Sequence, residues 1–396
     1  MAVNRCRVCA GAFFAEPLLR YRNMPGAAQH LPDATSLAAD QGADLDVCQC
    51  SDCGLVQLAN DPVPYWREVI RASAFSPEMG EFRRQQFRRF VEQFALSGKK
   101  VVEIGCGRGE YLSLMRQAGA AVYGVEFGAE SARQCIRDGL PVEQGFVEHE
   151  TTKLAHAPFA AFFILNFLEH LPDPNAVLRG VRNNLADGAV GLVEVPNFDM
   201  ILRKNLFSEF IGDHVFYFTQ ATLNATMERN GFDIVTSDEI WHDYIISTVV
   251  RKRSSVDRHS REVAPQAETP RQPLDLSGFS GQQARLKAEL EAYIARFGAG
   301  RVAVWGAGHQ ALAVLALAEL GGKIRYVVDS APFKQGKYTP ATHVPIVAPE
   351  ALAADPVEAV IVMAAAYSGE VAKIIRQRFG KRMAVAILHD SGLVAV

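Results

Sequence analysis

The sequence has 396 residues, of which 49% are hydrophobic and 21% are charged, and its formal net charge is −3. This length exceeds one ordinary hydrophobic core, so we expect two or three domains. The small charge argues against nucleic acid or an anionic membrane as a partner, and no apolar run is long enough to span a membrane. Because the first residues lack a secretory apolar region, we expect a cytoplasmic protein.

Two C-x-x-C motifs, Cys6-Arg-Val-Cys9 and Cys50-Ser-Asp-Cys53, are separated by forty residues. Each can present two thiolates to a tetrahedral ion, and together they complete a closed structural site. Seven cysteines without an export signal favour metal binding or burial over disulfides. We therefore expect an N-terminal module, residues 1–61, with structural Zn²⁺ held by Cys6, Cys9, Cys50 and Cys53. The alternatives are buried cysteines without a metal, or Cys48 as a ligand in place of Cys50.

Residues 77–96 have the pattern of one amphipathic helix. Its four arginines alternate with phenylalanines, which predicts a solvated basic face and not a nucleic-acid site; the arginines are Arg83, Arg84, Arg88 and Arg89.

The most informative segment is Val101-Val-Glu-Ile-Gly-Cys-Gly-Arg-Gly-Glu110. It predicts a buried strand, a turn with three alternate glycines and a helix that begins near Glu110. Glycines let the main chain approach a ligand closely, and Glu126, at the end of the next strand, is placed to accept hydrogen bonds from ribose hydroxyls.

Two kinds of cofactor use this layout. A dinucleotide rests its pyrophosphate on the helix N-terminus, but Glu103 would repel a pyrophosphate there. The same carboxylate suits the ammonium group of S-adenosylmethionine, which we expect as the cofactor. The expected binding residues in the turn and the second strand are Glu103, Gly105, Cys106, Gly107, Gly109 and Glu126. The alternative is an unliganded glycine turn.

From residue 99 the pattern alternates strands with helices, which predicts a doubly wound parallel sheet in an α/β fold. The strands are expected at 101–104, 122–126, 161–165 and 190–195. A helix with Thr219 as its N-cap and Gly231 at its end precedes two β-rich runs, 233–240 and 244–251. We expect residues 62–253 to form a class I methyltransferase domain with a reversed final strand.

A polar, proline-containing stretch then predicts a linker, residues 254–280, before a second Rossmann-like domain, residues 281–396. That domain is expected to begin with a helix around 282–297. Its turn Gly306-Ala-Gly-His-Gln-Ala311 and the acid Asp329 match a dinucleotide fingerprint, although His309 stands where small residues are usual. Lys334 and Lys337 are candidates to meet a substrate diphosphate, with a solvated loop as the alternative.

The order of these three parts resembles the zinc-containing sugar C-methyltransferases, which act on nucleotide-linked deoxy-keto-sugars. The segments that carry the resemblance are Cys53-Gly-Leu-Val-Gln57, Asn166-Phe-Leu-Glu-His170, Glu194-Val-Pro-Asn197, and Val328–Pro340 with Val344-Pro-Ile346. The resemblance implies that a base removes a proton beside a ketone and that the enolate carbon takes the cofactor methyl. It also implies a C-terminal domain that binds no dinucleotide and helps to enclose the substrate.

The resemblance implies two catalytic histidines here, His214 as the base and His170 as a group that polarises the carbonyl or binds a hydroxyl. Asp213 is expected to tune the base or to contact the substrate. The alternatives are that His170 shapes the cofactor pocket and that His214 caps the following helix. Phe127 and Phe146 are expected beside the adenine, and Asn166 near the methyl donor.

Two departures from the family pattern leave the acceptor open. The family has a tyrosine three residues before its base histidine, where this chain has Ile211. It has another beside serines upstream of the cofactor domain, where this chain reads Ile70-Arg-Ala-Ser-Ala-Phe-Ser76. Tyr65 and Tyr217 are near but out of register.

We therefore expect a methyltransferase that acts on a small molecule, most simply a carbon of a nucleotide-linked sugar, and that is a monomer or a small homo-oligomer. The alternatives are transfer to oxygen or to a non-sugar acceptor, an NAD-dependent oxidoreductase that uses the C-terminal fold, and a non-catalytic zinc-bearing interaction protein.

Overall fold

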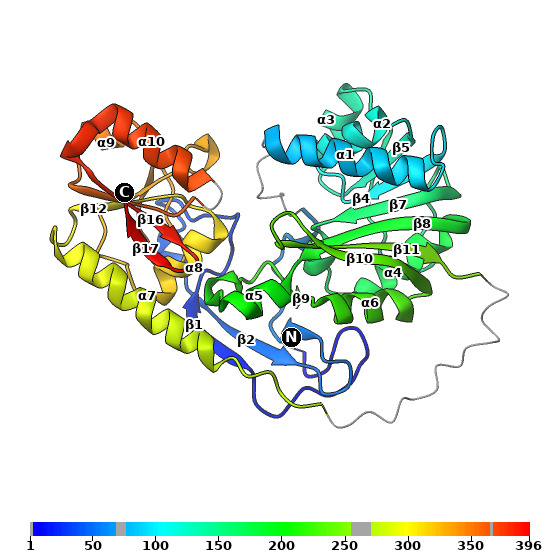
Figure 1. The fold of residues 1–396 in the computed structure, drawn as a ribbon, viewed down its shortest axis with the longest axis horizontal. Helices are drawn as coiled ribbons and strands as arrows, with labels where there is room; N and C mark the ends of the chain where they lie inside the picture. The colour runs from blue at the N-terminus through cyan, green and yellow to red at the C-terminus, as the bar shows by residue number, and fades with distance from the viewer. Residues whose placement is uncertain (1–2, 69–76, 255–270, 365–366) are drawn as a thin grey trace.

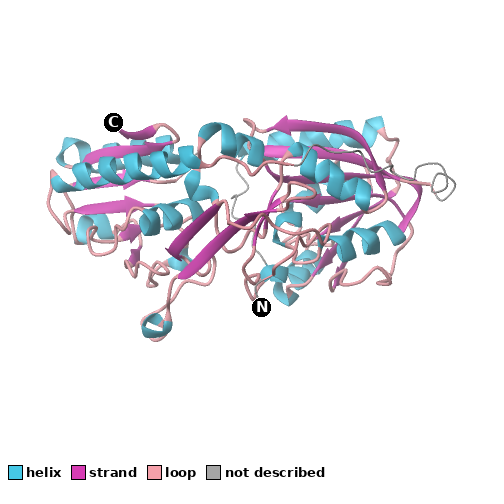
Figure 2. Ribbon diagram, turned by 90° about the horizontal axis from the view of Figure 1, so that it is seen from below, coloured by secondary structure: helices cyan, strands magenta, loops and turns pink. Residues whose placement is uncertain are grey.

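The computed structural model describes residues 3–68, 77–254, 271–364 and 367–396, which form three β-sheets. Figures 1 and 2 show an elongated molecule with one α/β sheet at each end and the small N-terminal sheet between them. The predicted α/β class, with a small N-terminal sheet and two larger sheets, is confirmed. Among the described residues, none of the helices has the length and apolarity needed to cross a membrane.

The N-terminal sheet has four antiparallel strands in the order β1-β2-β3-β9. The first three are β1 (Leu19–Met24), β2 (Ala43–Gln49) and β3 (Val56–Leu58). The fourth, β9 (Phe216–Tyr217), comes from much later in the chain and pairs with β3. Because β9 begins two residues after His214, this pairing fixes the predicted catalytic segment against the N-terminal module.

The central sheet has seven strands in the order β10-β11-β8-β7-β4-β5-β6. The parallel strands are β4 (Lys100–Ile104), β5 (Ala121–Glu126), β6 (Val142–Gln144), β7 (Phe159–Leu165) and β8 (Leu185–Pro196). Strand β11 (Ile245–Lys252) is antiparallel to β8 and to β10 (Phe232–Ile240). The expected strands and the reversed strand near the end of the domain are confirmed, and the short strand β6 was not predicted.

Helices cover both faces of this sheet, as a doubly wound fold requires (Figure 1). One face buries α1 (Pro77–Gln93), α2 (Glu110–Gln117) and α3 (Ala129–Arg137). The other buries α4 (Pro174–Asn183) and α6 (Gln220–Arg229). The predicted N-cap of α6 is confirmed, since the Thr219 side chain accepts a hydrogen bond from the Thr222 N–H.

The predicted basic face of α1 is wrong at Arg83, whose side chain is only 1% exposed. Residues 83, 87, 90 and 91 lie on one helical stripe, so Arg83 faces the sheet together with the buried Phe87 and Phe90. There it forms an ion pair with the fully buried Glu194 of β8. The Glu194 carboxylate also accepts a hydrogen bond from Ser247 at 2.9 Å.

The C-terminal sheet has the order β14-β13-β12-β15-β16-β17 and is parallel except for its last strand. Its strands are β12 (Val302–Trp305), β13 (Val327–Val328), β14 (Ile346–Val347), β15 (Ala359–Val362), β16 (Ala384–His389) and β17 (Gly392–Ala395). Its helices are α7 (Ser277–Ala295), α8 (His309–Leu317), α9 (Ala351–Ala354) and α10 (Ser368–Phe379).

One hydrophobic core joins the N-terminal sheet, α5 (Phe198–Lys204) and the C-terminal domain. Helix α8 packs against β1 and against the short 3-10 helix η4 (Phe207–Glu209). The predicted linker falls largely outside the described residues, and its last four residues, 277–280, form the start of α7. The domain limits given above remain predictions.

Candidate active site

The glycine turn connects β4 to α2. Gly105, Gly107 and Gly109 have φ angles of 72°, 55° and 83°, a region that residues with side chains rarely adopt. A Cβ atom at Gly105 would lie 2.6 Å from the Phe167 ring, whereas one at Gly107 would meet nothing within 4 Å. The main chain at Gly107 therefore borders open space, as a turn that cradles a ligand requires.

Two carboxylates stand at this turn. Glu103 is fully buried in β4, just before the glycines, and Glu126 is buried at the end of β5. The Glu126 carboxylate accepts hydrogen bonds from the N–H groups of Gly107, at 2.7 Å, and Gly128, at 2.8 Å. The two acids predicted for the ammonium and the ribose therefore flank one turn, and such a pair of hydrogen-bond acceptors fits S-adenosylmethionine. The Cys106 side chain is buried against Gly124, so only its main chain faces the turn.

The other expected cofactor residues lie around this turn. Phe127 directly follows Glu126 and is 37% exposed, and Phe146 stands beyond β6 with its ring 6.4 Å from that of Phe167. Asn166, at φ 50°, directly follows β7, and its N–H donates to the Glu194 carbonyl oxygen at 2.9 Å.

Two residues that the sequence did not predict cover the aromatic side of this site. The Trp66 ring contacts the Phe146 ring edge-on at 5.2 Å. The Arg67 guanidinium lies 5.5 Å from the Phe127 ring and 5.6 Å from the Phe146 ring. Both residues belong to the 3-10 helix η2 (Trp66–Glu68), far from the glycine turn in sequence.

The two predicted catalytic histidines are brought together. His170 ends the 3-10 helix η3 (Leu168–His170), and its ring centre lies 4.8 Å from that of His214. One ligand-type atom from each of Glu169, His170 and His214 lies within 4.8 Å of the others. Because Phe167, which contacts Gly105, is only three residues before His170, this cluster is directly linked to the glycine turn.

Main-chain contacts fix the tautomer of His170. Its Nδ1 lies 2.6 Å from the carbonyl oxygen of Asp213, which can only accept a hydrogen bond. Nδ1 therefore carries the proton, and Nε2 is left with its lone pair, 3.7 Å from a Glu169 carboxylate oxygen.

The Asp213 side chain is held by the N-terminal module. The Tyr65 hydroxyl donates to one carboxylate oxygen at 2.8 Å, and the Ala28 N–H donates to the other at 3.1 Å. The Tyr65 ring also stacks on the His30 ring at 4.3 Å. The fold thus brings Tyr65 to the site, although its position in the sequence does not match that of the family tyrosine. The Tyr217 hydroxyl instead forms hydrogen bonds with the main chain of Ile211. The segment 70–76 lies outside the described residues.

Burial decides the charge of the two histidines. Burial lowers the pKa of His170 to about 4, despite the Asp213 carbonyl oxygen. Burial, together with the nearby His170 and His309, lowers the pKa of His214 well below its usual value. Both imidazoles are therefore neutral at pH 7, the form in which an imidazole accepts a proton. Burial likewise raises the pKa of Asp213.

The four predicted cysteines form one cluster. The sulfur atoms of Cys6 and Cys53 are 3.7 Å apart, and those of Cys9 and Cys50 are 3.4 Å apart. A tetrahedral zinc ion with Zn–S bonds of about 2.3 Å needs sulfur separations of about 3.8 Å, so the donor set fits the metal. The Gln57 side chain donates to the Cys6 sulfur at 3.2 Å, as suits a thiolate. Cys48 is not part of this group.

At the second glycine turn, the acid of the predicted fingerprint is paired with a lysine. The Asp329 carboxylate accepts from the Ala307 N–H at 2.8 Å and pairs with Lys334 at 3.2 Å. Lys334 also donates to the Ala307 carbonyl oxygen at 2.9 Å. The Asp329 carboxylate, which a dinucleotide fingerprint would offer to a ribose, is therefore bound by both the main chain and a lysine.

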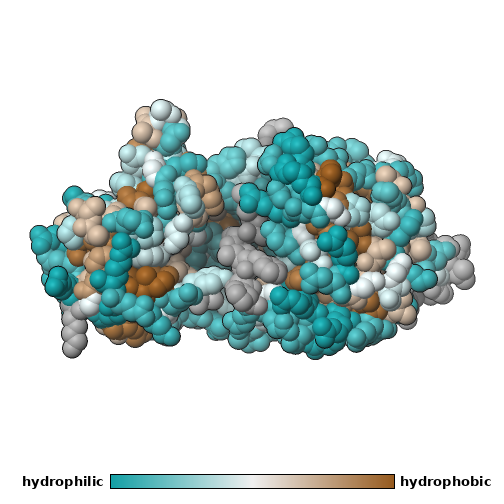
Figure 3. Space-filling model, turned by 90° about the horizontal axis from the view of Figure 1, so that it is seen from above, coloured by the Kyte–Doolittle hydropathy of each residue, from teal (hydrophilic) through white to brown (hydrophobic). Residues whose placement is uncertain are grey.

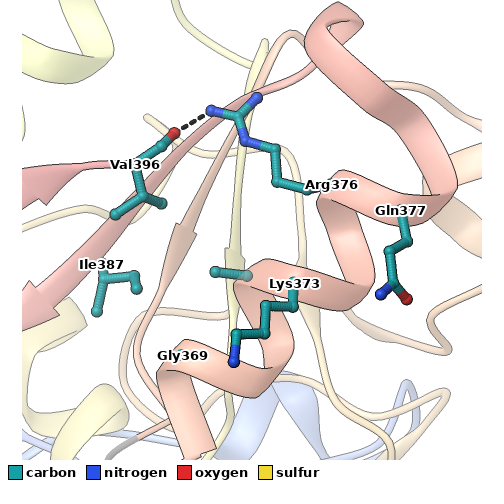
Figure 4. Close-up of a pocket in the computed structure, with 7 residues that line it drawn as sticks. Gly369, Lys373, Arg376, Gln377, Ile387 and Val396 are labelled. Carbon is teal, nitrogen blue, oxygen red and sulfur yellow. Dashed lines mark hydrogen bonds between the residues drawn. The ribbon is translucent and has the colours of Figure 1, made fainter.

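Two shallow cavities lie elsewhere. The first, of about 340 Å³, lies between α10 and the last strands (Figure 4). In it, Arg376 donates a hydrogen bond to the Val396 carbonyl oxygen. The described residues that line it are Gly369, Ala372, Lys373, Arg376, Gln377, Ile387 and Val396. The second, of about 510 Å³, is polar and includes Arg7 and Arg179. The described lining of neither includes a predicted site residue. Figure 3 shows a largely hydrophilic surface with small apolar patches.

Two families match the chain. Residues 79–237 match the family described as "Methyltransferase domain", and residues 251–387 match the family described as "C-methyltransferase C-terminal domain". With the fold and the glycine turn, these matches define the class: the chain is an S-adenosylmethionine-dependent methyltransferase that carries the C-terminal domain of C-methyltransferases.

The chain is similar over 387 residues to the C-methyltransferase NovU of Streptomyces niveus, with 26% identity covering 93% of this chain and 91% of that protein. It is also similar to a ubiquinone biosynthesis O-methyltransferase of Stutzerimonas stutzeri, at 34% identity, over 30% of this chain and 53% of that protein. Among solved structures, the CcbJ methyltransferase of Streptomyces caelestis matches 49% of this chain and 97% of its own, at 15% identity and a TM-score of 0.37.

Proposed function

We propose that this protein transfers a methyl group from S-adenosylmethionine to a carbon atom of a nucleotide-linked keto-sugar. The observation that carries the proposal is the C-methyltransferase C-terminal domain, in a chain whose likeness to a C-methyltransferase extends over nearly its whole length. The histidine cluster beside the glycine turn supports it, because a carbon acid needs a base near the methyl donor. S-adenosylmethionine supplies an electrophilic methyl on a sulfonium.

His214 is the proposed base. A ketone acidifies the neighbouring C–H bond, and the neutral imidazole of His214 takes that proton while the electron pair moves onto the carbonyl oxygen. The enolate carbon would then bond to the methyl group that bound S-adenosylmethionine supplies, and the electron pair of the broken C–S bond would stay on sulfur. Negative charge on the acceptor favours the imidazolium that forms, which offsets the effect of burial on His214.

His170 and Asp213 are proposed to position the reacting groups. The Asp213 carbonyl oxygen orients the His170 ring, and the unprotonated Nε2 atom of that ring accepts a hydrogen bond from a substrate hydroxyl. The Asp213 carboxylate is already engaged by Tyr65 and Ala28, so its proposed role is to hold the loop that carries His214.

The geometry around the glycine turn also supports roles for the other predicted binding residues. Glu103 and the glycine turn would hold the methionine end of the cofactor, Glu126 the ribose, and Phe127 and Phe146 the adenine, with Asn166 near the methyl donor. Zn²⁺ would be held by Cys6, Cys9, Cys50 and Cys53. That ion would have a structural role, since four thiolates leave it no open position.

Product analysis with labelled cofactor tests the proposal. The enzyme is incubated with nucleotide-linked keto-sugars and S-adenosylmethionine carrying a carbon-13 methyl group. The expected product has gained one methyl, whose carbon-13 signal couples to a ring carbon of the sugar. A label found on oxygen would instead support O-methylation, the activity named for the Stutzerimonas stutzeri relative that matches only the methyltransferase part. The matching reduced sugar, which has no ketone, is the control acceptor.

A further inference from the structure

The C-terminal domain contributes a third histidine to the predicted catalytic cluster. His309 is the first residue of α8, and its ring centre lies 6.2 Å from that of His214. His170, His214 and His309 therefore form a cluster of imidazoles from three separate parts of the chain, with His214 next to both of the others. His309 is half-buried, with 34% of its side chain exposed, so it is accessible to a small ligand.

An acidic residue holds His309 in place. A Glu209 carboxylate oxygen lies 3.7 Å from the Nε2 atom of His309. The other oxygen of Glu209 accepts a hydrogen bond from the Gln310 side chain at 3.2 Å. Since Glu209 ends η4 and η4 packs on α8, this pair also fixes the turn of the C-terminal sheet against the histidine cluster.

The surrounding charges make His309 different from its two neighbours. Glu209 and Asp213 face it as acids, and Lys334 faces it as a cation whose own charge is matched by Asp329. Burial lowers the pKa of His309, but Glu209 and Asp213 outweigh burial and leave that pKa raised. Burial keeps His170 and His214 neutral, whereas the acids around His309 favour the protonated form of its ring.

We propose that the imidazolium of His309 is a catalytic cation that donates a hydrogen bond to the acceptor oxygen as that oxygen becomes negative. This inference rests on the function proposed above and assigns a role within it. The proton of the C–H bond goes to His214, the electron pair goes to the oxygen, and His309 keeps its own proton. A donor that acts mainly on the developing charge contributes about 10²- to 10³-fold to kcat.

Four variants distinguish a role of the positive charge on His309 from a purely structural role of its side chain. His309→Gln removes the cation, His309→Lys retains a positive charge, and Glu209→Gln removes the acid that stabilises it. His389→Gln is the control, because His389 is an exposed histidine at the end of β16. The expected result is a kcat about 10²-fold lower for His309→Gln, with cofactor affinity unchanged, and a partial recovery in His309→Lys. The alkaline limb of the wild-type kcat profile should disappear in His309→Gln.

Histidine resonances of the full-length enzyme give a readout that needs no acceptor. In a labelled-histidine NMR titration, the pKa of His309 should lie above the usual histidine value of about 6.5, and Glu209→Gln should lower that pKa. Titration of His309 below about 6.5, or a His309→Gln enzyme within about twofold of wild type, would overturn the role of His309. A wild-type enzyme that methylates no keto-sugar overturns the proposed function itself, so the two failures are distinct.

Discussion

The Nδ1 atom of His170 lies 2.6 Å from the carbonyl oxygen of Asp213, the residue directly before His214. This contact joins the end of η3 to the loop before β9, so the position of the His170 ring depends on the loop that carries His214. Because β9 pairs with β3 of the N-terminal sheet, the cysteine-rich module helps to place the predicted base.

The first prediction concerns His214. The substitution His214→Gln keeps a polar side chain but removes the group that accepts the substrate proton. We expect kcat to fall about 10²- to 10⁴-fold while the affinity for S-adenosylmethionine is unchanged. Steady-state kinetics and calorimetric titration measure the two quantities, with His389→Gln as the matched control. A variant with wild-type turnover would return His214 to a structural role.

The second prediction concerns Tyr65. The substitution Tyr65→Phe removes the hydrogen bond to Asp213 and leaves that buried carboxylate with the Ala28 N–H. We expect a loss of stability of about 1–2 kcal/mol and a fall in kcat of about tenfold, since the loop before β9 loses one anchor. Chemical denaturation and kinetics test this, with Tyr244→Phe at a partly exposed tyrosine as control. Unchanged kcat in Tyr65→Phe would show that this anchor is dispensable.

The third prediction concerns pH. Burial lowers the folded-state pKa of His170 to about 4, against about 6.5 in the unfolded chain. The unfolded state therefore binds more protons below pH 6.5, and the stability contributed by neutral His170 is present above that pH and is lost as pH falls toward 4. Between pH 7 and pH 5 we expect this residue to account for about 2 kcal/mol of lost unfolding free energy. Denaturant titrations of wild type and His170→Gln measure it, and an equal pH dependence in both would contradict it.

The fourth prediction concerns the metal. The purified protein should contain about one zinc per chain, and Cys53→Ala should lose it and lower the melting temperature. Methyl transfer should fall as well, because Ala28 and Tyr65 of the same N-terminal region hold Asp213. Cys48→Ala is the matched control and should retain zinc, since Cys48 lies outside the four-cysteine group. Zinc retained in Cys53→Ala would argue against the four-thiolate site.

Local patterns in the sequence predicted the features that depend on near neighbours. The glycine spacing predicted the turn after β4, and the two C-x-x-C motifs predicted the cysteine cluster. The resemblance supplied His170 and His214, which the fold brings together.

Local sequence patterns could not predict the features that depend on contacts between residues far apart in the chain. Tyr65 meets Asp213 across 148 positions of the chain, and His309 reaches His214 from another sheet. Arg83 shares the helical stripe of Phe87 and Phe90, but only the distant Glu194 supplies the charge that allows an arginine to be buried there. No periodicity within one element encodes such pairs, because each depends on how separate elements pack.

Hydrogen exchange at the acceptor carbon reports on the proposed enolate without any need for methyl transfer. The wild-type enzyme is incubated in heavy water with a nucleotide-linked keto-sugar and S-adenosylhomocysteine, which occupies the cofactor site but has no methyl group to transfer. We predict that proton NMR shows loss of the C–H signal beside the ketone, and that His214→Gln abolishes this loss. Full retention of that signal by a wild-type enzyme that methylates the same sugar would contradict an enolate and the assignment of His214 as base.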